Sequence, residues 1–574
     1  MKASDYIVSY LYQRGVTHIY EVIGGMITHM IDSADRHGKI KLVSMHHEQS
    51  ASFAAHAMGH TTGVPGVALA TSGPGAVNLL TGMGSCYFDS VPAIFITGQV
   101  NLSELKGDRQ IRQLGFQETD IVSMARPITK AAWMIQSPAE IPAALDEAFS
   151  LALSGRPGPV LLDIPMDIQR MDVPGTPVIP QEIPLERFQD SAALQALFEA
   201  VNQAQRPVIL AGGGINSAHA LGSFRQFVDM LGIPVVNSLM AVDVLPHTHP
   251  QRVGLIGSYG NRWANMALGG SDMLLVLGSR LDIRQTGADV RSFGANRKIF
   301  HVDCESGEIN NRVQGCFPIH ADLRAFLPAA LEAGKAFAFK EHADWQAEIK
   351  QMHLDWPDVN EIKIEQGTNP NQFMHALSRV SGQAAGFVID VGNHQMWAAQ
   401  SLDLNPDQKF ITSGGMGAMG FSLPAAIGAS FASPGKPIVQ IAGDGGFQMN
   451  IQELETIAHH KLPVKMVVLN NESYGMVRQF QQSYFHERYP STFQGYSAPD
   501  FEKIASAYGI RAATVGKTEE SVQQGLAQLW ADPTEPFLLQ VQIDPMINAY
   551  PKIAFGYPLT QMEPFVKPLD MEGT

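Results

Sequence analysis

The chain has 574 residues, enough for roughly three or four domains of ordinary size. Apolar residues make up 45% of it and can fill several hydrophobic cores, whereas the formal net charge of −15 argues against nucleic acids and anionic membranes as partners. Three cysteines without paired or metal-ligand spacing, no signal-peptide pattern and no long apolar run together predict a soluble protein of the reducing cytoplasm.

Short apolar runs alternate with longer helical segments and fall into three blocks. The predicted strands are residues 67–70, 93–96 and 160–164 in the first block, 208–211, 234–236, 274–277 and 299–302 in the second, and 386–391, 437–442, 464–469 and 537–543 in the third. A Pro-rich stretch, 173–184, is typical of a linker, and a polar helical stretch, 337–367, leads into the third block. This alternation predicts three parallel-sheet α/β domains.

The third block contains a motif that indicates a phosphate and a metal ion. Gly443-Asp444-Gly445 follows one predicted strand, and Asn470-Asn471 follows the next after a spacer of 24 residues with helical periodicity. In such a βαβ unit both motifs lie at the same edge of the sheet. There the Asp444 carboxylate and the Asn471 amide oxygen suit Mg²⁺ or Ca²⁺, and the glycines let a phosphate approach the backbone. By itself the pattern also fits a glycine turn beside an Asn-Asn loop.

The motif resembles the diphosphate- and metal-binding signature of thiamine diphosphate (ThDP) enzymes. In that family, a glutamate from a different domain hydrogen-bonds the aminopyrimidine ring. Residues 45–51, which contain Glu48 and precede an Ala-rich helix, match the segment that carries this glutamate, and residues 71–78 match a motif that follows it. Within the family, the chain resembles acetolactate synthase (large, catalytic subunit) and related pyruvate carboligases over nearly its whole length. The stretches that carry this resemblance are residues 97–100, 115–118, 126–130, 154–159, 392–400 and 414–420.

The resemblance implies an architecture and an assembly. We expect three doubly wound parallel-sheet domains: a pyrimidine-binding domain over residues 1–172, a central FAD-binding-like domain over 190–335 and a diphosphate-binding domain over 365–545, followed by a C-terminal tail over 546–574. In the family, the first domain of one subunit and the third domain of its neighbour share one ThDP. An obligate homodimer is therefore expected, with a homotetramer as the larger assembly, and no regulatory subunit is evident.

The resemblance also implies roles for individual residues. Glu48 is expected to hydrogen-bond N1′ of the aminopyrimidine and promote loss of the thiazolium C2 proton, and Met419 either to hold the cofactor bent or to be a core methionine. The expected Mg²⁺ ligands are Asp444, Asn471 and the backbone carbonyl of Ser473. The other residues expected beside ThDP are Pro74, Asn78, Val391, Gly392, Asn393, His394, Gly417, Gly443, Gly445, Gly446, Tyr474, Gly475 and Met476. The expected substrate contacts are Gly25, Gln99, Phe116, Gln117, Met476 and Phe480.

The fate of the two-carbon fragment after pyruvate loses CO₂ decides the reaction. Aldehyde-releasing relatives protonate this fragment with a histidine pair, and His46-His47 offers such a pair in the sequence. Both lie directly before Glu48 at the end of a strand, which indicates loop histidines with a structural role. An apolar site with little acid favours attack on a second carbonyl compound, so we expect a carboligase that uses pyruvate as donor.

The middle block indicates FAD as a further cofactor. Gly212-Gly213-Gly214 after a strand is by itself a weak phosphate pattern and more often a plain turn. Together with other stretches it resembles the FAD contacts of acetolactate synthases. The expected contacts are Arg156, Gly212, Gly213, Gly214, Ser238, Leu239, Met240, Gly257, Ser258, Tyr259, Gly278, Ser279, Arg280, Asp282, Arg284, Asp303, Cys304, Asp322, Gln395, Met396, Gly414 and Gly415. An emptied relic of such a site is the alternative.

The acceptor stays open because of the loop between residues 99 and 116, which is longer than in the synthases. It carries Lys106, Arg109 and Arg112. If the loop lies at the substrate entrance, these basic residues favour an anionic acceptor such as a nucleotide-linked keto-sugar. The alternative is a loop whose charges are simply solvated. Phe480 stands where synthases commonly carry tryptophan, and Met166 where they carry lysine. The acceptor is therefore either a 2-oxo acid or a sugar ketone.

Three kinds of function remain: the carboligase, a flavin oxidase of pyruvate on the same scaffold, and a catalytically silent scaffold or regulatory protein. Glu48 and the complete set of metal ligands argue against the third. Electron transfer to the flavin, as opposed to carbon–carbon bond formation, separates the first two.

Overall fold

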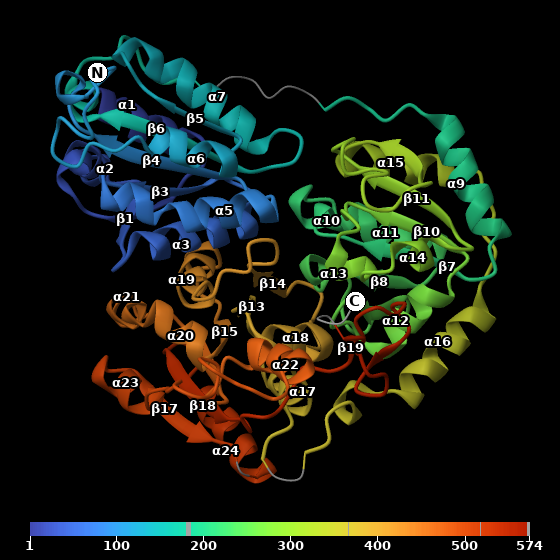
Figure 1. The fold of residues 1–574 in the computed structure, drawn as a ribbon. Helices are drawn as coiled ribbons and strands as arrows, with labels where there is room; N and C mark the ends of the chain where they lie inside the picture. Colours follow the sequence, from blue (N-terminus) through green and yellow to red (C-terminus); the bar gives the residue numbers. More distant parts are fainter. Residues whose placement is uncertain (179–184, 365–366, 517, 571–574) are drawn as a thin grey trace.

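The computed structural model describes residues 1–178, 185–364, 367–516 and 518–570. It contains three six-stranded sheets, and every strand pair described in them is parallel. Helices cover both faces of each sheet; the N-terminal and C-terminal domains lie one above the other, and the central domain lies beside them (Figure 1). The predicted fold class, α/β with three doubly wound parallel-sheet domains, is confirmed.

The N-terminal sheet has the strand order β2-β1-β3-β4-β6-β5. Its strands are β1 (His18–Val22), β2 (Lys41–Ser44), β3 (Gly66–Ala70), β4 (Ala93–Gln99), β5 (Ala131–Met134) and β6 (Pro159–Pro165). Its helices are α1 (Ala3–Gln13), α2 (Thr28–His37), α3 (Glu48–Thr62), α4 (Pro74–Asn78), α5 (Leu80–Asp89), α6 (Ile121–Ala125), α7 (Ile141–Leu153) and α8 (Met166–Arg170). Because successive strand residues point to opposite faces, Ile19 joins the core under α1, α2 and α7, whereas Tyr20 joins the core under α3 and α5.

The central sheet has the strand order β12-β11-β10-β7-β8-β9. Its strands are β7 (Pro207–Ala211), β8 (Val235–Asn237), β9 (Arg252–Leu255), β10 (Met273–Leu277), β11 (Lys298–Asp303) and β12 (Phe317–His320). Its helices are α9 (Ser191–Gln203), α10 (Gly214–Ser217), α11 (Leu221–Leu231), α12 (Arg262–Gly270), α13 (Ile283–Thr286), α14 (Val290–Gly294), α15 (Leu323–Gly334) and α16 (Ala343–Asp355). The strand order reverses between β7 and β10, and a parallel sheet opens a crevice at the carboxyl ends of such a pair.

The C-terminal sheet has the strand order β14-β13-β15-β16-β18-β17. Its strands are β13 (Gly386–Ile389), β14 (Lys409–Thr412), β15 (Ile438–Gly443), β16 (Val464–Asn470), β17 (Arg511–Val515) and β18 (Phe537–Gln542). Its helices are α17 (Pro370–Val380), α18 (Asn393–Ser401), α19 (Ser422–Ala432), α20 (Asp444–Met449), α21 (Leu454–His460), α22 (Gly475–Tyr484), α23 (Phe501–Ala507) and α24 (Glu519–Leu529). Numbered within each domain, the first and third sheets share one strand order, which gives both a crevice at the same place.

Helices α3 and α19 join the N-terminal and C-terminal domains. A Cβ atom on Gly428 would lie 2.1 Å from the carbonyl oxygen of Ala54, so the two backbones almost touch where the helices cross. Phe53 and Phe421 meet edge to face beside the crossing, with ring centroids 5.2 Å apart. The two domains therefore share one continuous hydrophobic core.

The C-terminal segment packs against the central domain. Its short strands β19 (Lys552–Ile553) and β20 (Met562–Glu563) pair antiparallel. Ile553 and Met562 belong to the core between the central sheet and α12. Arg262 on α12 donates a hydrogen bond of 3.1 Å to the carbonyl oxygen of Glu563. The described part of the predicted tail, up to residue 570, therefore closes one face of the central domain.

Each of the eleven predicted strand ranges overlaps an observed strand, and β2 lies where a strand was expected to end before Glu48. In the three six-stranded sheets, the sequence pattern does not predict β1, β5, β9, β12, β14 or β17. All of these except β1 are edge strands. The predicted linker 173–184 and the stretch 337–367 lie only partly within the described residues; α16 forms in the second. Within the described ranges, no helix combines the length and apolarity that a bilayer crossing requires.

Candidate active site

Glu48 is the first residue of α3, and its carboxylate faces the short helix α4. Asn78 Nδ2 donates a hydrogen bond of 2.9 Å to Glu48 Oε2. On the other side, a Cβ atom on Gly75 would lie 3.2 Å from Glu48 Oε1, so the helix backbone closes over the carboxylate. The two sequence motifs of the predicted pyrimidine site are thus joined in space, at the carboxyl ends of β2 and β3.

The two histidines before Glu48 are engaged in other contacts. His47 Nδ1 accepts a hydrogen bond of 3.0 Å from the Gln49 amide and so caps the amino terminus of α3. The His46 amide donates to Glu453 Oε1 at 3.0 Å, and its Nδ1 lies 3.1 Å from the Thr456 hydroxyl in the C-terminal domain. Both residues therefore have the structural contacts that we expected of loop histidines.

Three of the predicted substrate residues lie at this open edge of the N-terminal sheet. Gly25 is exposed in the turn after β1, with nothing near the position of its missing Cβ. Gln117 packs on the turn before α4, because a Cβ on Gly73 would lie 3.0 Å from Gln117 Cβ. Phe116 is 79% exposed. This edge leaves apolar side chains open to solvent.

Gln99, by contrast, lies beneath this edge. It is 2% exposed, and its Nε2 donates to the Thr119 carbonyl at 2.8 Å and to Asp163 Oδ2 at 2.9 Å. Burial raises the pKa of Asp163 to about 7, although hydrogen bonds from Thr97 and Gln99 lower it. The amide of Gln99 is thus used inside the domain, where it holds the loop that leads from Gln117.

The predicted metal ligands meet at the carboxyl ends of β15 and β16. The terminal amide of Asn471 lies 2.9 Å from both Asp444 Oδ1 and the Ser473 carbonyl oxygen. Turned one way it donates two hydrogen bonds; turned the other way it completes a set of three oxygens of the kind that Mg²⁺ prefers. Burial raises the pKa of Asp444 to about 6, against a hydrogen bond of 2.8 Å from the Tyr496 hydroxyl. The donor set fits the metal.

This oxygen set differs from a cluster of ionisable ligands. Among the described residues, no group of three or more His, Cys, Asp or Glu side chains is arranged to hold a metal ion. The predicted site instead combines one carboxylate, one amide and one backbone carbonyl, which suits a hard cation that also binds a phosphate.

The glycines beside these ligands are required by close contacts. A Cβ on Gly446 would lie 2.4 Å from Asp390 Oδ1, and one on Gly445 would lie 2.4 Å from Tyr474 Cε1. A Cβ on Gly475 would lie 2.8 Å from Asn393 Nδ2. A side chain at any of these positions would force a neighbouring side chain to move, so glycine leaves the backbone open where a diphosphate is predicted to lie.

Buried polar atoms without a partner lie at the same place. His394 Nε2 and Asn393 Oδ1 are buried and have no hydrogen-bond partner within the described residues. Burial lowers the pKa of His394 to about 3, so its ring is neutral at physiological pH. Because buried polar groups are normally paired, these atoms fit a site that receives a polar ligand. Gly392, at the start of α18, adopts a φ of 157° beside them.

A cavity of about 510 Å³ lies where the three domains meet. Its lining includes every predicted FAD contact except Gly212 and Gly257, and also Val391, Gly417 and Met476, which were predicted beside ThDP. The two predicted cofactor sites therefore share a wall. The remaining predicted substrate residue, Phe480, is 41% exposed on the same helix as Met476.

Gly212 and Gly257 serve the packing of turns instead. A Cβ on Gly212 would lie 2.1 Å from the Gly278 carbonyl oxygen, and one on Gly257 would lie 2.3 Å from the Arg284 carbonyl oxygen. The first contact brings together the turns after β7 and β10, at the place where the strand order reverses. The glycine run thus shapes the crevice, while Gly213 and Gly214 line it.

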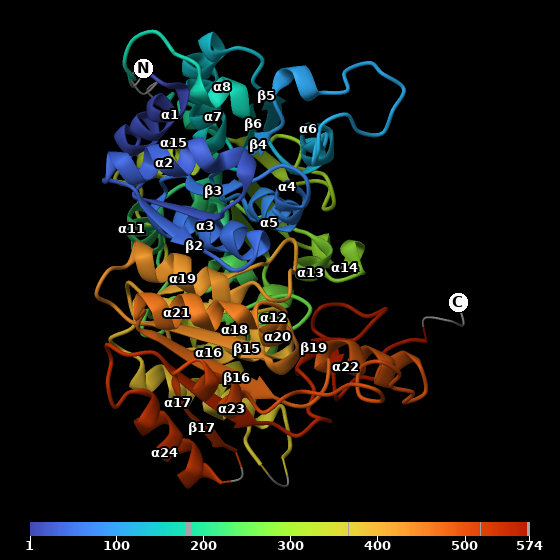
Figure 2. The ribbon, with the colours of Figure 1, turned by 90° about the vertical axis from the view of Figure 1, so that its left-hand side faces the viewer.

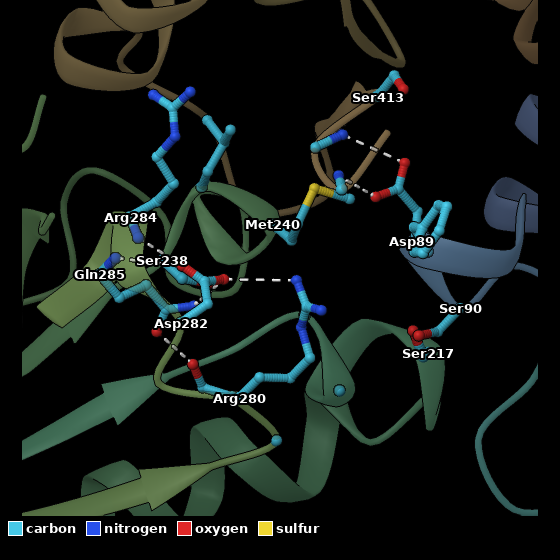
Figure 3. A pocket seen from close by; sticks show the side chains of 18 of the residues that line it. Asp89, Ser90, Ser217, Ser238, Met240, Arg280, Asp282, Arg284, Gln285 and Ser413 are labelled. Carbon is cyan, nitrogen blue, oxygen red and sulfur yellow. Dashed lines mark hydrogen bonds and ion pairs between the residues drawn. The ribbon is translucent and has the colours of Figure 1, made fainter. Parts of the chain in front are cut away.

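Ion pairs between domains and within the central domain hold the polar lining in place. Arg156 Nη1 lies 3.0 Å from Glu305 Oε2 and 3.1 Å from Glu308 Oε1, which ties the N-terminal domain to the central one. Arg280 lies 3.4 Å from Asp282, as drawn in Figure 3. With these groups fixed, the cavity offers arginines suited to a diphosphate and carboxylates suited to hydroxyl groups.

Sequence reasoning missed several lining residues, among them Asp89, Ser217 and Gln285. Gln285 comes directly after Arg284 and close to Asp282, so the neighbouring motif could have included it. Asp89 ends an apolar helix of the first domain and carries no motif of its own. Its contribution to a cavity centred on the central domain depends on domain packing.

Comparisons with known proteins identify the class. Three family models match the chain: "Thiamine pyrophosphate enzyme, N-terminal TPP binding domain" over residues 1–124, the "central domain" of these enzymes over 194–330 and their "C-terminal TPP binding domain" over 390–541. Thiamine pyrophosphate is another name for ThDP. The chain belongs to the family of ThDP enzymes, as its motifs predicted.

Full-length relatives narrow the class. The chain is 35% identical over 571 residues to "Acetolactate synthase isozyme 2 large subunit" of Escherichia coli, covering 98% of this chain and 99% of that protein. It is 36% identical to "Acetolactate synthase 2, chloroplastic" of Nicotiana tabacum (97% and 84% covered) and 34% identical to "Probable acetolactate synthase large subunit" of Methanocaldococcus jannaschii (100% and 96%). The chain is therefore a ThDP-dependent, acetolactate synthase-like enzyme, and the hypothesis of a silent scaffold is not supported.

Proposed function

We propose that this enzyme is a ThDP- and Mg²⁺-dependent carboligase that decarboxylates pyruvate and transfers the two-carbon unit to the carbonyl group of a second molecule. The observation that carries the proposal is the pair of polar clusters at equivalent edges of two sheets: Glu48 with Asn78 in one, and Asp444 with Asn471 and Ser473 in the other. One cluster suits an aminopyrimidine and the other suits a metal-bound diphosphate. The names of the relatives supply the reaction class.

The residues of the chain would divide the work between the two clusters. Bound ThDP supplies a carbon nucleophile and accepts the electron pair released with CO₂. Glu48 would share a proton with N1′ of the aminopyrimidine, and Asn78 would hold the Glu48 carboxylate in that position. Asp444, Asn471 and Ser473 would hold Mg²⁺ against the diphosphate, and neutral His394 would hydrogen-bond the diphosphate without adding charge.

The substrate side would favour carbon–carbon bond formation. Phe116, Met476 and Phe480 would surround the two-carbon unit with apolar side chains, and Gly25 would leave room for the methyl group of pyruvate. His46 Nδ1 lies 3.1 Å from the Thr456 hydroxyl and His47 Nδ1 accepts from the Gln49 amide, which supports the view that neither ring protonates the substrate. Met419 would hold the cofactor bent.

An obligate homodimer is proposed as the active form, with a homotetramer as the larger assembly. Among the described residues, neither Glu48 nor Asp444 lines the large cavity. Apolar side chains next to both clusters are exposed in the single chain: Val77 at 39%, Met449 at 47% and Val477 at 53%. A second copy that pairs one cluster with the other would bury these side chains.

FAD is proposed as the occupant of the large cavity. The cavity's volume of about 510 Å³ and its lining of arginines, serines and carboxylates fit a flavin dinucleotide. Flavin absorbance and fluorescence of the purified protein, and their recovery after removal and addition of FAD, test this part separately from the reaction.

Product analysis tests the reaction. The protein is incubated with ThDP, Mg²⁺, FAD and isotope-labelled pyruvate, first alone and then with a panel of 2-oxo acids and keto-sugars. We expect labelled acetolactate from pyruvate alone. Failure to form any carbon–carbon adduct would overturn the carboligase. Bleaching of the flavin by pyruvate without oxygen, together with no adduct, would establish the oxidase in its place.

A sugar ketone is the second candidate for the acceptor, and the segment between β4 and α6 favours it. This segment extends away from the body of the N-terminal domain (Figure 2), and the Glu118 carboxylate orders it by accepting 2.7 Å hydrogen bonds from the Lys106 and Leu114 amides. Arg109 and Arg112 are both exposed on it, but Arg109 Nη1 already donates to the Leu105 carbonyl oxygen at 3.0 Å. Lys106 and Arg112 therefore have the basic groups available for an anionic acceptor.

A further inference from the structure

We propose that Asp89 is a positioning residue that pre-organises the loop from Ser413 to Met419, the wall shared by the large cavity and the predicted ThDP site. The proposal deepens the proposed function and rests on it, because the roles of Met419 and of FAD belong to that function. In this proposal, a side chain of the first domain determines the conformation of a loop of the third domain. That loop lies beside both predicted cofactor sites.

The contact between Asp89 and the loop crosses two domains. Asp89 ends α5 in the N-terminal domain, and its carboxylate accepts hydrogen bonds from the amides of Gly414 at 3.2 Å and Gly415 at 2.6 Å. In Figure 3 the Asp89 carboxylate points towards Met240, and dashed lines mark its two hydrogen bonds. Asp89 is 8% exposed, so water competes little for the two bonds. A carboxylate that accepts from two adjacent amides fixes both peptide planes.

The same stretch of backbone is wedged between two other domains. A Cβ on Gly415 would lie 2.7 Å from Phe88 Cβ of the N-terminal domain, and one on Gly414 would lie 2.2 Å from Met240 Sδ of the central domain. The Ser85 and Ser413 hydroxyls lie 3.1 Å apart on the same side. All three domains therefore contribute contacts to the course of the loop.

The far end of the loop is held by a second buried carboxylate. Asp390 accepts hydrogen bonds from the Gly420 amide at 3.0 Å and the Ser422 amide at 2.8 Å. Met419 lies between these two anchors, Asp89 at the start of the loop and Asp390 at its end. Asp390 belongs to the same domain as the loop. Asp89 belongs to a different domain, so its contact with the loop depends on how the two domains pack. Loss of Asp89 would free the cavity-side half of the loop and leave the other half anchored.

The surroundings of Asp89 agree with a finely balanced carboxylate. Burial raises its pKa to about 7, while the Gly415 and Gly414 amides and the positive charges of Arg280 and Arg156 lower it. Arg280 lies on the turn after β10 and Arg156 before β6, so both other charges that face Asp89 come from the cavity wall. Cys86, one turn earlier on α5, has its pKa raised mainly by burial and also by Asp89.

The order of this loop would affect both cofactors. If the loop is ordered before ThDP arrives, ThDP binding does not have to order it; without Asp89 the binding-competent loop is only partly populated, and the apparent affinity falls by that fraction. FAD in the cavity would contact the same Gly414–Gly415 wall and would restore part of the loss. By linkage, ThDP would then raise the affinity for FAD by the same factor.

Titration of ThDP into FAD-free and FAD-loaded protein, with Mg²⁺ present and no substrate, tests the proposal. In FAD-free Asp89→Asn, we expect the ThDP affinity to be about tenfold below that of the unmodified protein. Addition of FAD should recover part of this loss, and a coupling of this size between two ligands is within the usual range. Asp272→Asn is the matched control, because Asp272 also accepts hydrogen bonds from two adjacent amides, those of Gln205 and Arg206, at 2.7 and 2.9 Å. This control should bind ThDP normally.

Two results would overturn the proposal: ThDP affinity of FAD-free Asp89→Asn within twofold of the unmodified protein, or an equal loss in Asp272→Asn, which would indicate general destabilisation. Asp89→Ala, compared by the same titration, serves if the asparagine variant does not fold. If the unmodified protein binds no FAD, the FAD part of the proposed function fails, and the comparison in FAD-free protein still decides the role of Asp89.

Discussion

Asn78 Nδ2 lies 2.9 Å from Glu48 Oε2, and this hydrogen bond joins two sequence motifs that are 30 residues apart. The bond orients the carboxylate at the start of α3 towards the open edge of the sheet. In a ThDP enzyme, this is the edge at which the aminopyrimidine of the cofactor is expected.

Glu48→Gln should retain most of the ThDP affinity and lower turnover by about 10²-fold or more, the scale of general acid–base catalysis. The amide keeps the size of the side chain but cannot share a proton with the pyrimidine. Steady-state rates and cofactor titration on the same preparation check this. Glu140→Gln, which changes an exposed helix-start glutamate in the same domain, is the control. Near-normal turnover of Glu48→Gln would remove this residue from the mechanism.

Asp444→Ala should abolish Mg²⁺-dependent ThDP binding while the fold and any bound FAD persist, because it removes the one carboxylate from the predicted ligand set. Calorimetric titration with ThDP and Mg²⁺ measures the effect. Tyr496→Phe removes the hydroxyl that donates to Asp444 Oδ2 and keeps the ligand oxygens, so it should bind ThDP with a much smaller loss. Unchanged binding by Asp444→Ala would show that the metal site lies elsewhere.

Neutralising Lys106 and Arg112 together should weaken the use of an anionic sugar ketone by about 1.5–3 kcal/mol for each lost charge-assisted contact. Acetolactate formation from pyruvate should continue. Apparent KM for the two acceptors, compared in the double methionine variant and in the exposed control Lys39→Met, separates the cases. If the parent enzyme does not turn over sugar ketones, the loop is a solvated loop and a 2-oxo acid is the acceptor.

Acid should destabilise the contact between α3 and α19 through His56. Burial lowers the pKa of His56 to about 3, and both ring nitrogens are buried without a partner in the described residues. Its contribution is fully present above the unfolded pKa of 6.5 and is lost as the pH falls below it, because the unfolded chain then takes up a proton that the folded one refuses. The melting temperature of His56→Leu should fall less between pH 7 and 5 than that of the unmodified protein. Replacing exposed His459 on α21 should leave this slope unchanged.

Alkali should act through His375 in the opposite direction. Burial lowers the pKa of His375, but hydrogen bonds of 2.9 Å to Asp358 and 2.8 Å to Asp403 outweigh it and raise the pKa to about 9. Its stabilisation is fully present below pH 6.5 and is lost as the pH rises through about 9. His375→Gln should therefore be less stable than the unmodified protein at pH 7 and approach it near pH 10. Parallel melting curves across this range would contradict the assignment.

The interior strands and the cofactor motifs could be predicted because their signals are local. The strands β15 and β16, which are buried on both faces, are mostly apolar, with one polar residue inside each run, Gln440 and Lys465; Asp444 and Asn471 directly follow these strands. The unpredicted strands β5, β9, β12, β14 and β17 lie at sheet edges, where one side has no neighbouring strand. Polar residues interrupt four of them, and β5 is a run of only four half-buried residues. β1 is internal but contains His18 and Glu21, which break its apolar run.

The amino-acid sequence by itself determined the class of the protein, since the residues that suit ThDP, Mg²⁺ and FAD lie in short motifs at strand ends. Only the tertiary structure decided which groups the Gln99 amide contacts and how the C-terminal segment packs on the central domain. It also decided that Asp89 accepts a hydrogen bond from Gly414, 325 residues further along the chain. The physical reason is the range of the interactions. Strand and turn patterns depend on neighbours along the chain, whereas the contact of Asp89 with Gly414 and Gly415 exists only where the N-terminal and C-terminal domains pack together.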